Sequence, residues 1–209
     1  MAGALALRAD QLRQRANMVE ILHMLIPSSS ALVLVEPAET QASHVSFDFA
    51  CHSQRMIAVA ALAGVPVLHA VYSASMRGQH SVSQQSKIDG THRIQFEPEP
   101  NAWATSTLGT VLAASGRNQV VVIGHWLEES ITLLVLNCLS TGLDTYVPSD
   151  LTPAITSANE LAARARLNQA GAVPTSSEQI IREWAALHHD EKIAQPLLDL
   201  LSSIPLHSR

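Results

Sequence analysis

Charged side chains are scarce in this sequence, and so are aromatic rings and long hydrophobic stretches. Charged residues make up 15% of the 209 residues and aromatic residues 4%. The formal net charge of −5 leaves no excess of basic groups for nucleic acid or an anionic membrane, so we expect neither as a partner. No apolar stretch reaches the roughly 18 residues that a transmembrane helix needs. The N-terminus lacks the basic segment and apolar core of a signal peptide, and we expect a cytoplasmic protein.

Cysteine is also rare, and the two cysteines, Cys51 and Cys138, exclude a disulfide framework and a cysteine-based metal site. Ten histidines are present, but none stands in an H-x-H or H-E-x-x-H pattern. The sequence therefore predicts no metal and no cofactor. Hydrophobic residues make up 47% of the chain, which is typical of a globular protein with a sizeable core.

Short apolar runs alternate with helical patterns along the whole chain. The runs lack polar alternation, which is typical of parallel strands buried on both faces. The order predicts an α/β fold of three layers, α/β/α, around a mainly parallel, doubly wound sheet. We expect strands at 31–36, 67–72, 93–96 (short or at an edge), 119–124, 144–148 and 172–174. We expect helices at 9–25, 46–63, 105–114, 128–140, 152–169, from a capping box at 175–178 to about 187, and at about 192–202, with a polar loop at 73–92.

The pattern indicates a single domain over 1–209, with a helical extension at 1–28. The C-terminal helices at 176–209 are a candidate interface between copies of the chain. Their apolar positions are Ile180, Ile181, Trp184 and Leu187.

The most informative stretch is 119–130, where a β-branched run ends at Gly124 and a turn leads into an apolar helix. A side chain in the first turn of such a helix lies above the carboxyl end of the sheet, where backbone N–H groups favour anions. Ser130 is therefore the first candidate for a nucleophile. Glu36, Tyr72 and Glu97 are also predicted at the carboxyl ends of strands, where parallel α/β sheets bind ligands.

This stretch resembles the nucleophile region of the isochorismatase-like superfamily of cysteine hydrolases, which includes nicotinamidases. In that family a V-V-V-x-G strand precedes a turn and T/E-x-C, and Ser130 occupies the cysteine position. The strand at 31–36 is similar to the family's A-L-L-V-I-D segment. The resemblance covers about 30–190 and includes the segments Gly64-Val65-Pro66-Val67-Leu68, Asn101-Ala102-Trp103 and Gln169-Ala170-Gly171-Ala172-Val173-Pro174, with Glu178-Gln179 and Glu183-Trp184.

The resemblance implies a catalytic Asp, Lys and Cys, and all three are replaced in this chain. Glu36 stands at the Asp position, Phe96 or Glu97 at the Lys position, and Ser130 at the Cys position. A serine hydroxyl needs a positioned base, and loss of the lysine removes the cation expected to keep Glu36 ionised. The resemblance also places oxyanion-hole N–H groups at Trp126 and Ser130, and a cis peptide between His125 and Trp126.

The family chemistry is hydrolysis of a small amide, imide, ureide or vinyl ether, and we expect it to be weak or lost here. One alternative is a non-catalytic small-molecule-binding or assembly protein on the same fold. Another is a serine-type hydrolase using Ser130 with Glu36 or a histidine as its base. His69, Tyr72, Trp103 and His125 are the candidate pocket residues. The resemblance further implies a homo-oligomer that binds a small molecule.

Overall fold

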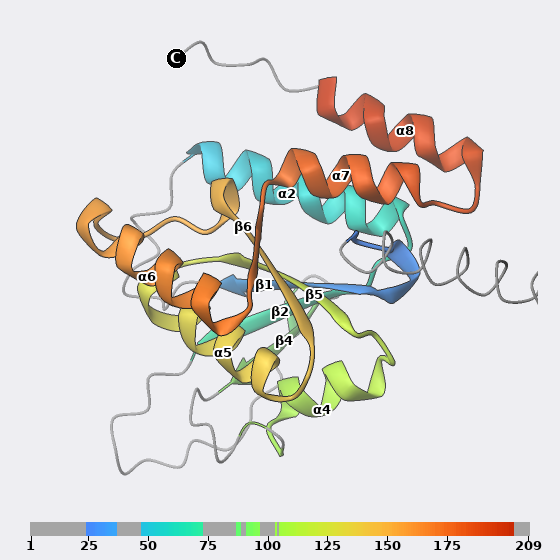
Figure 1. Cartoon of the computed structure of the whole chain (residues 1–209). Coiled ribbons are helices and arrows are strands. Elements are labelled where there is room, and N and C mark those ends of the chain that lie inside the picture. The colour runs from blue at the N-terminus through green and yellow to red at the C-terminus, as the bar shows by residue number, and fades with distance from the viewer. Residues whose placement is uncertain are drawn as a thin grey trace, which may run out of the picture.

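The chain forms one twisted sheet between two layers of helices (Figure 1). The computed structural model describes residues 24–36, 47–72, 87–88, 91–96, 103 and 105–202. Outside these ranges lie nearly all of the helix expected at 9–25, most of the loop at 73–92, Glu97 and the Asn101-Ala102 pair.

Seven strands build the described sheet, in the order β3-β4-β2-β1-β5-β6-β7. They are β1 (Ser30–Glu36), β2 (Val67–Tyr72), β3 (Lys87–Ile88), β4 (Thr91–Phe96), β5 (Gln119–Gly124), β6 (Asp144–Pro148) and β7 (Val173–Thr175). Six of them run parallel, and β3 pairs antiparallel with β4. The predicted doubly wound sheet is therefore confirmed. The short β3 was not predicted, and it takes the edge position that the sequence suggested for β4.

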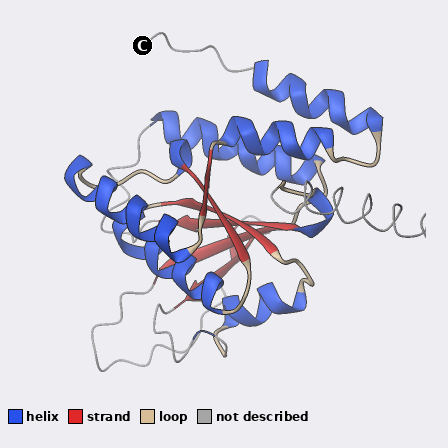
Figure 2. Ribbon diagram, in the orientation of Figure 1, coloured by secondary structure: helices blue, strands red, loops and turns tan. Residues whose placement is uncertain are grey.

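The helices divide between the two faces of the sheet (Figures 1 and 2). Helices α2 (Phe47–Leu62) and α7 (Ser177–Ala186) cover one face, with the short η4 (Ser149–Leu151), and α8 (Glu191–Ser202) packs on the outer side of α7 and α2. The short η1 (Pro27–Ser29) immediately precedes β1. Helices α4 (Thr107–Ala114), α5 (Thr132–Ser140) and α6 (Ser157–Ala170) cover the other, and η3 (Leu127–Ile131) leads into α5. No helix among the described residues is both long and apolar enough to cross a membrane.

Strand β1 explains why the predicted strands carry uninterrupted apolar runs. Successive side chains of a strand point to opposite faces, and here each face has its own core. Ala31, Val33 and Val35 pack toward α4, α5 and α6, whereas Leu32 and Leu34 pack toward α2, α7 and α8. A polar residue on either face is therefore an exception that needs a reason.

Several helix starts differ from the sequence-based expectation, and α4 begins at Thr107 rather than 105, capped by the Ser106 hydroxyl. Helix α6 begins at Ser157 rather than near 152, because the Thr156 hydroxyl accepts from Asn159 N and caps it there. The helix expected from 128 begins as a π-helical turn at Leu127, with Ile131 N bonded to Trp126 O. Helix α7 is capped by Ser176, one residue after the predicted Thr175, since the Ser176 hydroxyl accepts from Gln179 N.

The C-terminal apolar residues lie mainly inside the chain. Ile180, Ile181 and Trp184 are fully buried between α7 and the sheet. These three side chains therefore provide no exposed apolar surface for a second copy. The exposed large apolar residues of the described chain are Leu62, Ile155 and Leu161.

Candidate active site

The turn after β5 depends on Gly124, which has a φ of 128°. A Cβ atom at this position would overlap the Val35 carbonyl group of the neighbouring strand, so only glycine fits. The His125–Trp126 peptide that follows is cis, as the resemblance implies. His125 N donates to Val35 O at 3.2 Å and holds the turn against the end of β1.

Ser130 lies in this turn with a side chain that is only 2% exposed. Its hydroxyl donates to the carbonyl oxygen of His125 at 2.6 Å. A hydroxyl has one proton to donate, and here that proton goes to the backbone. Among the described residues, no carboxylate or imidazole is hydrogen-bonded to Ser130. The catalytic role of Ser130 therefore stays a prediction from the resemblance.

Glu36, at the carboxyl end of β1, is held by two side chains from neighbouring strands. Its Oε1 is 3.3 Å from His69 Nδ1 and accepts from Arg93 Nε at 3.2 Å, and its Oε2 lies 2.9 Å from Arg93 Nη2. The hydrogen bond from His69 and the charge of Arg93 lower the pKa of Glu36, although burial acts to raise it. An ionised carboxylate only accepts hydrogen bonds, so this network assigns the proton of His69 to Nδ1.

Arg93 was missed because the sequence argument sought a lysine after the strand. The cation comes instead from within β4, at the position that pairs in register with His69 of β2. Phe96, at the predicted lysine position, is 1% exposed and belongs to the core on the other face. An arginine within a predicted strand was the signal available. Arg93 therefore corrects the expectation that Glu36 has no neighbouring cation.

His125 is not positioned to act as the base for Ser130, because the hydroxyl bonds to its backbone carbonyl group. The His125 ring is buried against Phe49 of α2, with ring centroids 4.0 Å apart, and lies 4.7 Å from the Trp126 ring. Burial lowers the pKa of His125 to about 4, so the ring is neutral near pH 7. His125 Nδ1 and Trp126 Nε1 are both buried without a hydrogen-bond partner in the described structure.

The other predicted pocket residues contribute less. Trp103 is 2% exposed within the core beneath α4, and its carbonyl group accepts from Ser106 N and Oγ. Tyr72 pairs through its backbone with Phe96. A separate pocket lies between β6, β7 and α6, lined by Val147, Ser149, Arg164, Leu167, Asn168 and Pro174. It contains none of the predicted site residues.

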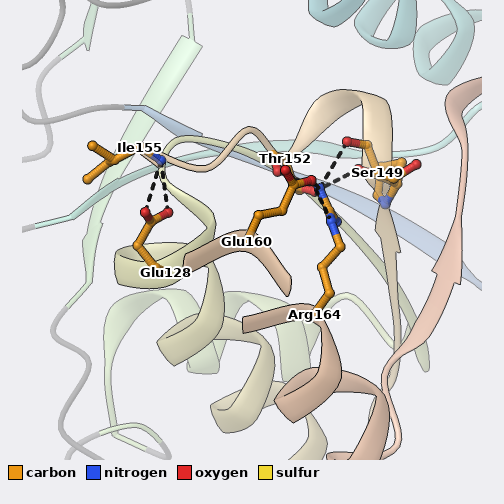
Figure 3. A network of polar contacts seen from close by, with 7 residues as sticks. Glu128, Ser149, Thr152, Ile155, Glu160 and Arg164 are labelled. Atoms are coloured by element: carbon orange, nitrogen blue, oxygen red, sulfur yellow. Dashed lines mark hydrogen bonds and ion pairs between the residues drawn. The ribbon is translucent and has the colours of Figure 1, made fainter. Parts of the chain in front are cut away.

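Glu128 connects the turn to the start of α6 (Figure 3). Both of its carboxylate oxygens accept from Ile155 N at 3.0 Å, and Leu127 N donates to Pro153 O. Arg164 holds the other end of this segment by donating to the carbonyl oxygens of Ser149 and Thr152. The segment 149–156 is therefore fixed against the turn from two sides.

A family model described as the isochorismatase domain matches residues 30–179. The chain belongs to the isochorismatase family. No curated protein matches the chain closely.

Solved structures with the same fold cover most of the chain. YcaC from Pseudomonas aeruginosa, solved with a covalent acrylamide, is 16% identical with a TM-score of 0.62, over 87% of this chain and 98% of its own. The YcaC gene product of Escherichia coli, described as an octameric hydrolase of unknown specificity, is 17% identical with a TM-score of 0.61, over 87% and 98%. The MAR1 ribonuclease of Caenorhabditis elegans is 20% identical with a TM-score of 0.61, over 89% and 100%. At these identities the likeness concerns the fold alone.

Proposed function

We propose that this member of the isochorismatase family has lost the family's cysteine chemistry and retains the binding of a small molecule. One observation carries the proposal: the hydroxyl at the nucleophile position donates to the backbone carbonyl oxygen of His125 at 2.6 Å. To attack a carbonyl carbon, Ser130 would have to exchange this bond for one to a base. The candidate base, Glu36, is already bonded to Arg93 and His69.

The side chains that are bonded to Glu36 support the same proposal. The ion pair with Arg93 keeps Glu36 ionised, and an ionised carboxylate with a lowered pKa is a poor acceptor for a serine proton. The turn that would provide the oxyanion-hole N–H groups of Trp126 and Ser130 is nevertheless retained. A retained turn without an activated nucleophile is the combination expected of a binding protein derived from a hydrolase.

A panel of substrates tests this proposal. We would assay nicotinamide, isochorismate, simple amides, imides and ureas with the wild type, Ser130→Ala and Ser130→Cys. We expect the wild type and Ser130→Ala to be equally inactive. Hydrolysis by the wild type that disappears in Ser130→Ala would contradict the proposal. Activity that appears only in Ser130→Cys would support the proposal, because it would show that the site lacks only the cysteine nucleophile.

A serine-type hydrolase is the second candidate, and the hydrogen bond between Glu36 and His69 favours it. This bond leaves His69 Nε2 with a lone pair, which is the arrangement of the carboxylate–imidazole pair of serine hydrolases. His69→Gln separates the two proposals. A wild-type activity lost in both His69→Gln and Ser130→Ala would assign a Ser-His-Glu arrangement, whereas the first proposal predicts no activity to lose.

We also infer that the chain forms a homo-oligomer, supported by the octameric YcaC of Escherichia coli. Nucleic acid is a poor fit as a partner in spite of the ribonuclease among the similar structures. The net charge of −5 opposes binding to a phosphate backbone, which requires a surplus of Lys and Arg. A small molecule bound at the carboxyl edge of the sheet remains the partner that we propose.

A further inference from the structure

Polar residues of three neighbouring strands and of the turn after β5 form a staggered row on the α2 side of the sheet. His69 of β2 pairs in register with Arg93 of β4, and Val35 of β1 pairs with Gly124 of β5. The next residues, Glu36 and His125, therefore lie side by side. Glu36 shares a face with Leu34, and His125 contacts Phe49, and both of these apolar residues belong to the α2-side core. The row lies beside apolar residues of this face, such as Leu34 and Phe49.

The long side chain of Arg93 brings its guanidinium group to Glu36, and Glu36 follows Val35, whose carbonyl oxygen accepts from His125 N. Neighbouring strands are about 4.8 Å apart, and Arg93 reaches across β2 to bond with Glu36 on β1. The guanidinium group thus lies beside β1, and His125 follows β5, the next strand in the sheet. A group of only a few atoms is long enough to contact both residues.

Several nitrogen atoms at this edge of the sheet have no hydrogen-bond partner among the described residues. The Glu36 oxygens already take N–H groups from His69 and from Nε and Nη2 of Arg93. Arg93 Nη1 has no hydrogen bond to any residue that the structure describes. His125 Nδ1 and Trp126 Nε1 are buried and likewise unpartnered in that part of the chain. Buried polar groups are nearly always paired in native proteins, so these two ring nitrogens are candidates for contact with a ligand. The Arg93 side chain is 36% exposed, so a ligand can reach it from solvent.

We propose that this row is a binding site for a small carboxylate, held by Arg93 Nη1, by Trp126 Nε1 and by His125 in the tautomer that carries its proton on Nδ1. A carboxylate has two acceptor oxygens and matches a guanidinium edge well. The charges of Glu36 and Arg93 offset each other, so N–H groups rather than net charge select the ligand. This inference rests on the proposed binding function and names its ligand class. The site is on the α2 side, whereas Ser130 leads into α5 on the other side.

Benzoate and its neutral isostere benzamide are suitable probes, because their rings can pack against the rings of Phe49, His125 and Trp126. Calorimetric titration of the wild type should show saturable benzoate binding in the millimolar range and at least about tenfold weaker benzamide binding. Labelling with 5-fluorotryptophan gives a second readout, since the chain has only three tryptophans. The signal that Trp126→Phe removes should be the one that benzoate shifts most.

Charge variants separate the role of Arg93 from a general effect of charge. Arg93→Gln should weaken benzoate binding by about tenfold or more, and Arg93→Lys should weaken it less. The double variant Glu36→Gln/Arg93→Gln restores neutrality and should stay weak, because the N–H donors are still missing. Glu36→Gln alone should bind benzoate more tightly. Arg182→Gln, on the exposed surface of α7, should match the wild type.

Several results would overturn the carboxylate site. These are no saturable benzoate binding, benzamide binding as tightly as benzoate, or a folded Arg93→Gln with wild-type affinity. Thermal unfolding of each variant shows whether it is folded. These outcomes are independent of the substrate panel, because hydrolysis that depends on Ser130 would contradict the proposed function without changing the affinity for benzoate.

Discussion

At the scale of single residues, the site is defined by which polar atoms are paired with each other. The Ser130 hydroxyl donates to the carbonyl oxygen of His125, and Glu36 is bonded to Arg93 and His69. The sequence predicted the positions of Ser130 and Glu36 but not their partners. A partner from another strand depends on register and side-chain length, and neither is encoded locally around Glu36. Arg93 could be found only after β4 had been aligned with β2.

His125 should make stability depend on pH. Its pKa falls from 6.5 to about 4 on folding because of burial, so the unfolded chain binds a proton first as the pH falls. Stability is therefore full above pH 6.5 and declines as the pH falls to about 4, by at most about 3 kcal/mol. Urea unfolding from pH 7 to 4 should show this slope in the wild type and a smaller one in His125→Phe.

An exposed histidine provides the control for this measurement. His189→Gln, in the turn between α7 and α8, should keep the wild-type slope. Equal slopes in the wild type and His125→Phe would contradict a buried neutral His125. Glu36 acts in a lower window, because its lowered pKa adds stability that is lost as the pH falls below about 4.5. Glu36→Gln should therefore change only the most acidic part of the profile.

At the scale of elements, the strands, most helices and the turn after β5 could be predicted, whereas the segment before α6 and the short β3 could not. Apolar runs such as 119–124 identify buried strands because both faces of the sheet are covered. The start of α6 was placed too early, since nothing near Thr152 shows that Glu128 and Arg164 hold the segment 149–156 in an irregular conformation. The short β3 was missed for a related reason, because two residues carry too little periodicity to indicate a strand.

The bonds from Glu128 to the α6 segment predict a matched pair of variants. Glu128→Ala should lower the free energy of unfolding by about 1 kcal/mol, because the N–H groups of Ile155 and Thr156 lose their acceptor. Glu129→Ala removes the adjacent carboxylate, which makes no hydrogen bond through its side chain in the described structure. Urea unfolding should give Glu129→Ala the stability of the wild type. Equal losses for the two variants would contradict a specific role for Glu128.

At the scale of the whole molecule, the exposed apolar residues of α6 and of the segment just before it are the best-placed surface for contact between copies. Leu161 is 78% exposed and Ile155 is 49% exposed. Such residues in one region are a common sign of an interface, whereas Ile180, Ile181 and Trp184 are already buried within the chain. The predicted interface on the C-terminal helices would thus have to use other residues.

Light scattering tests this assignment. We expect a mass several times the 22.5 kDa of one chain for the wild type, and a smaller mass for Leu161→Lys, because a buried lysine without a partner opposes assembly. Leu62 is another exposed leucine, located on α2. Leu62→Lys is therefore the control and should keep the wild-type mass. A monomeric wild type would exclude the oligomer. Assembly unaffected by Leu161→Lys would place the interface elsewhere.

The most direct test of the central claim is the nucleophilicity of Ser130. A fluorophosphonate probe reacts with serines activated by a base, and intact-mass measurement shows whether an adduct forms. Because the Ser130 hydroxyl donates to the His125 carbonyl group rather than to a base, we predict no adduct on the folded wild type. An adduct that forms on the wild type and is absent from Ser130→Ala would contradict the account and identify this protein as a serine hydrolase.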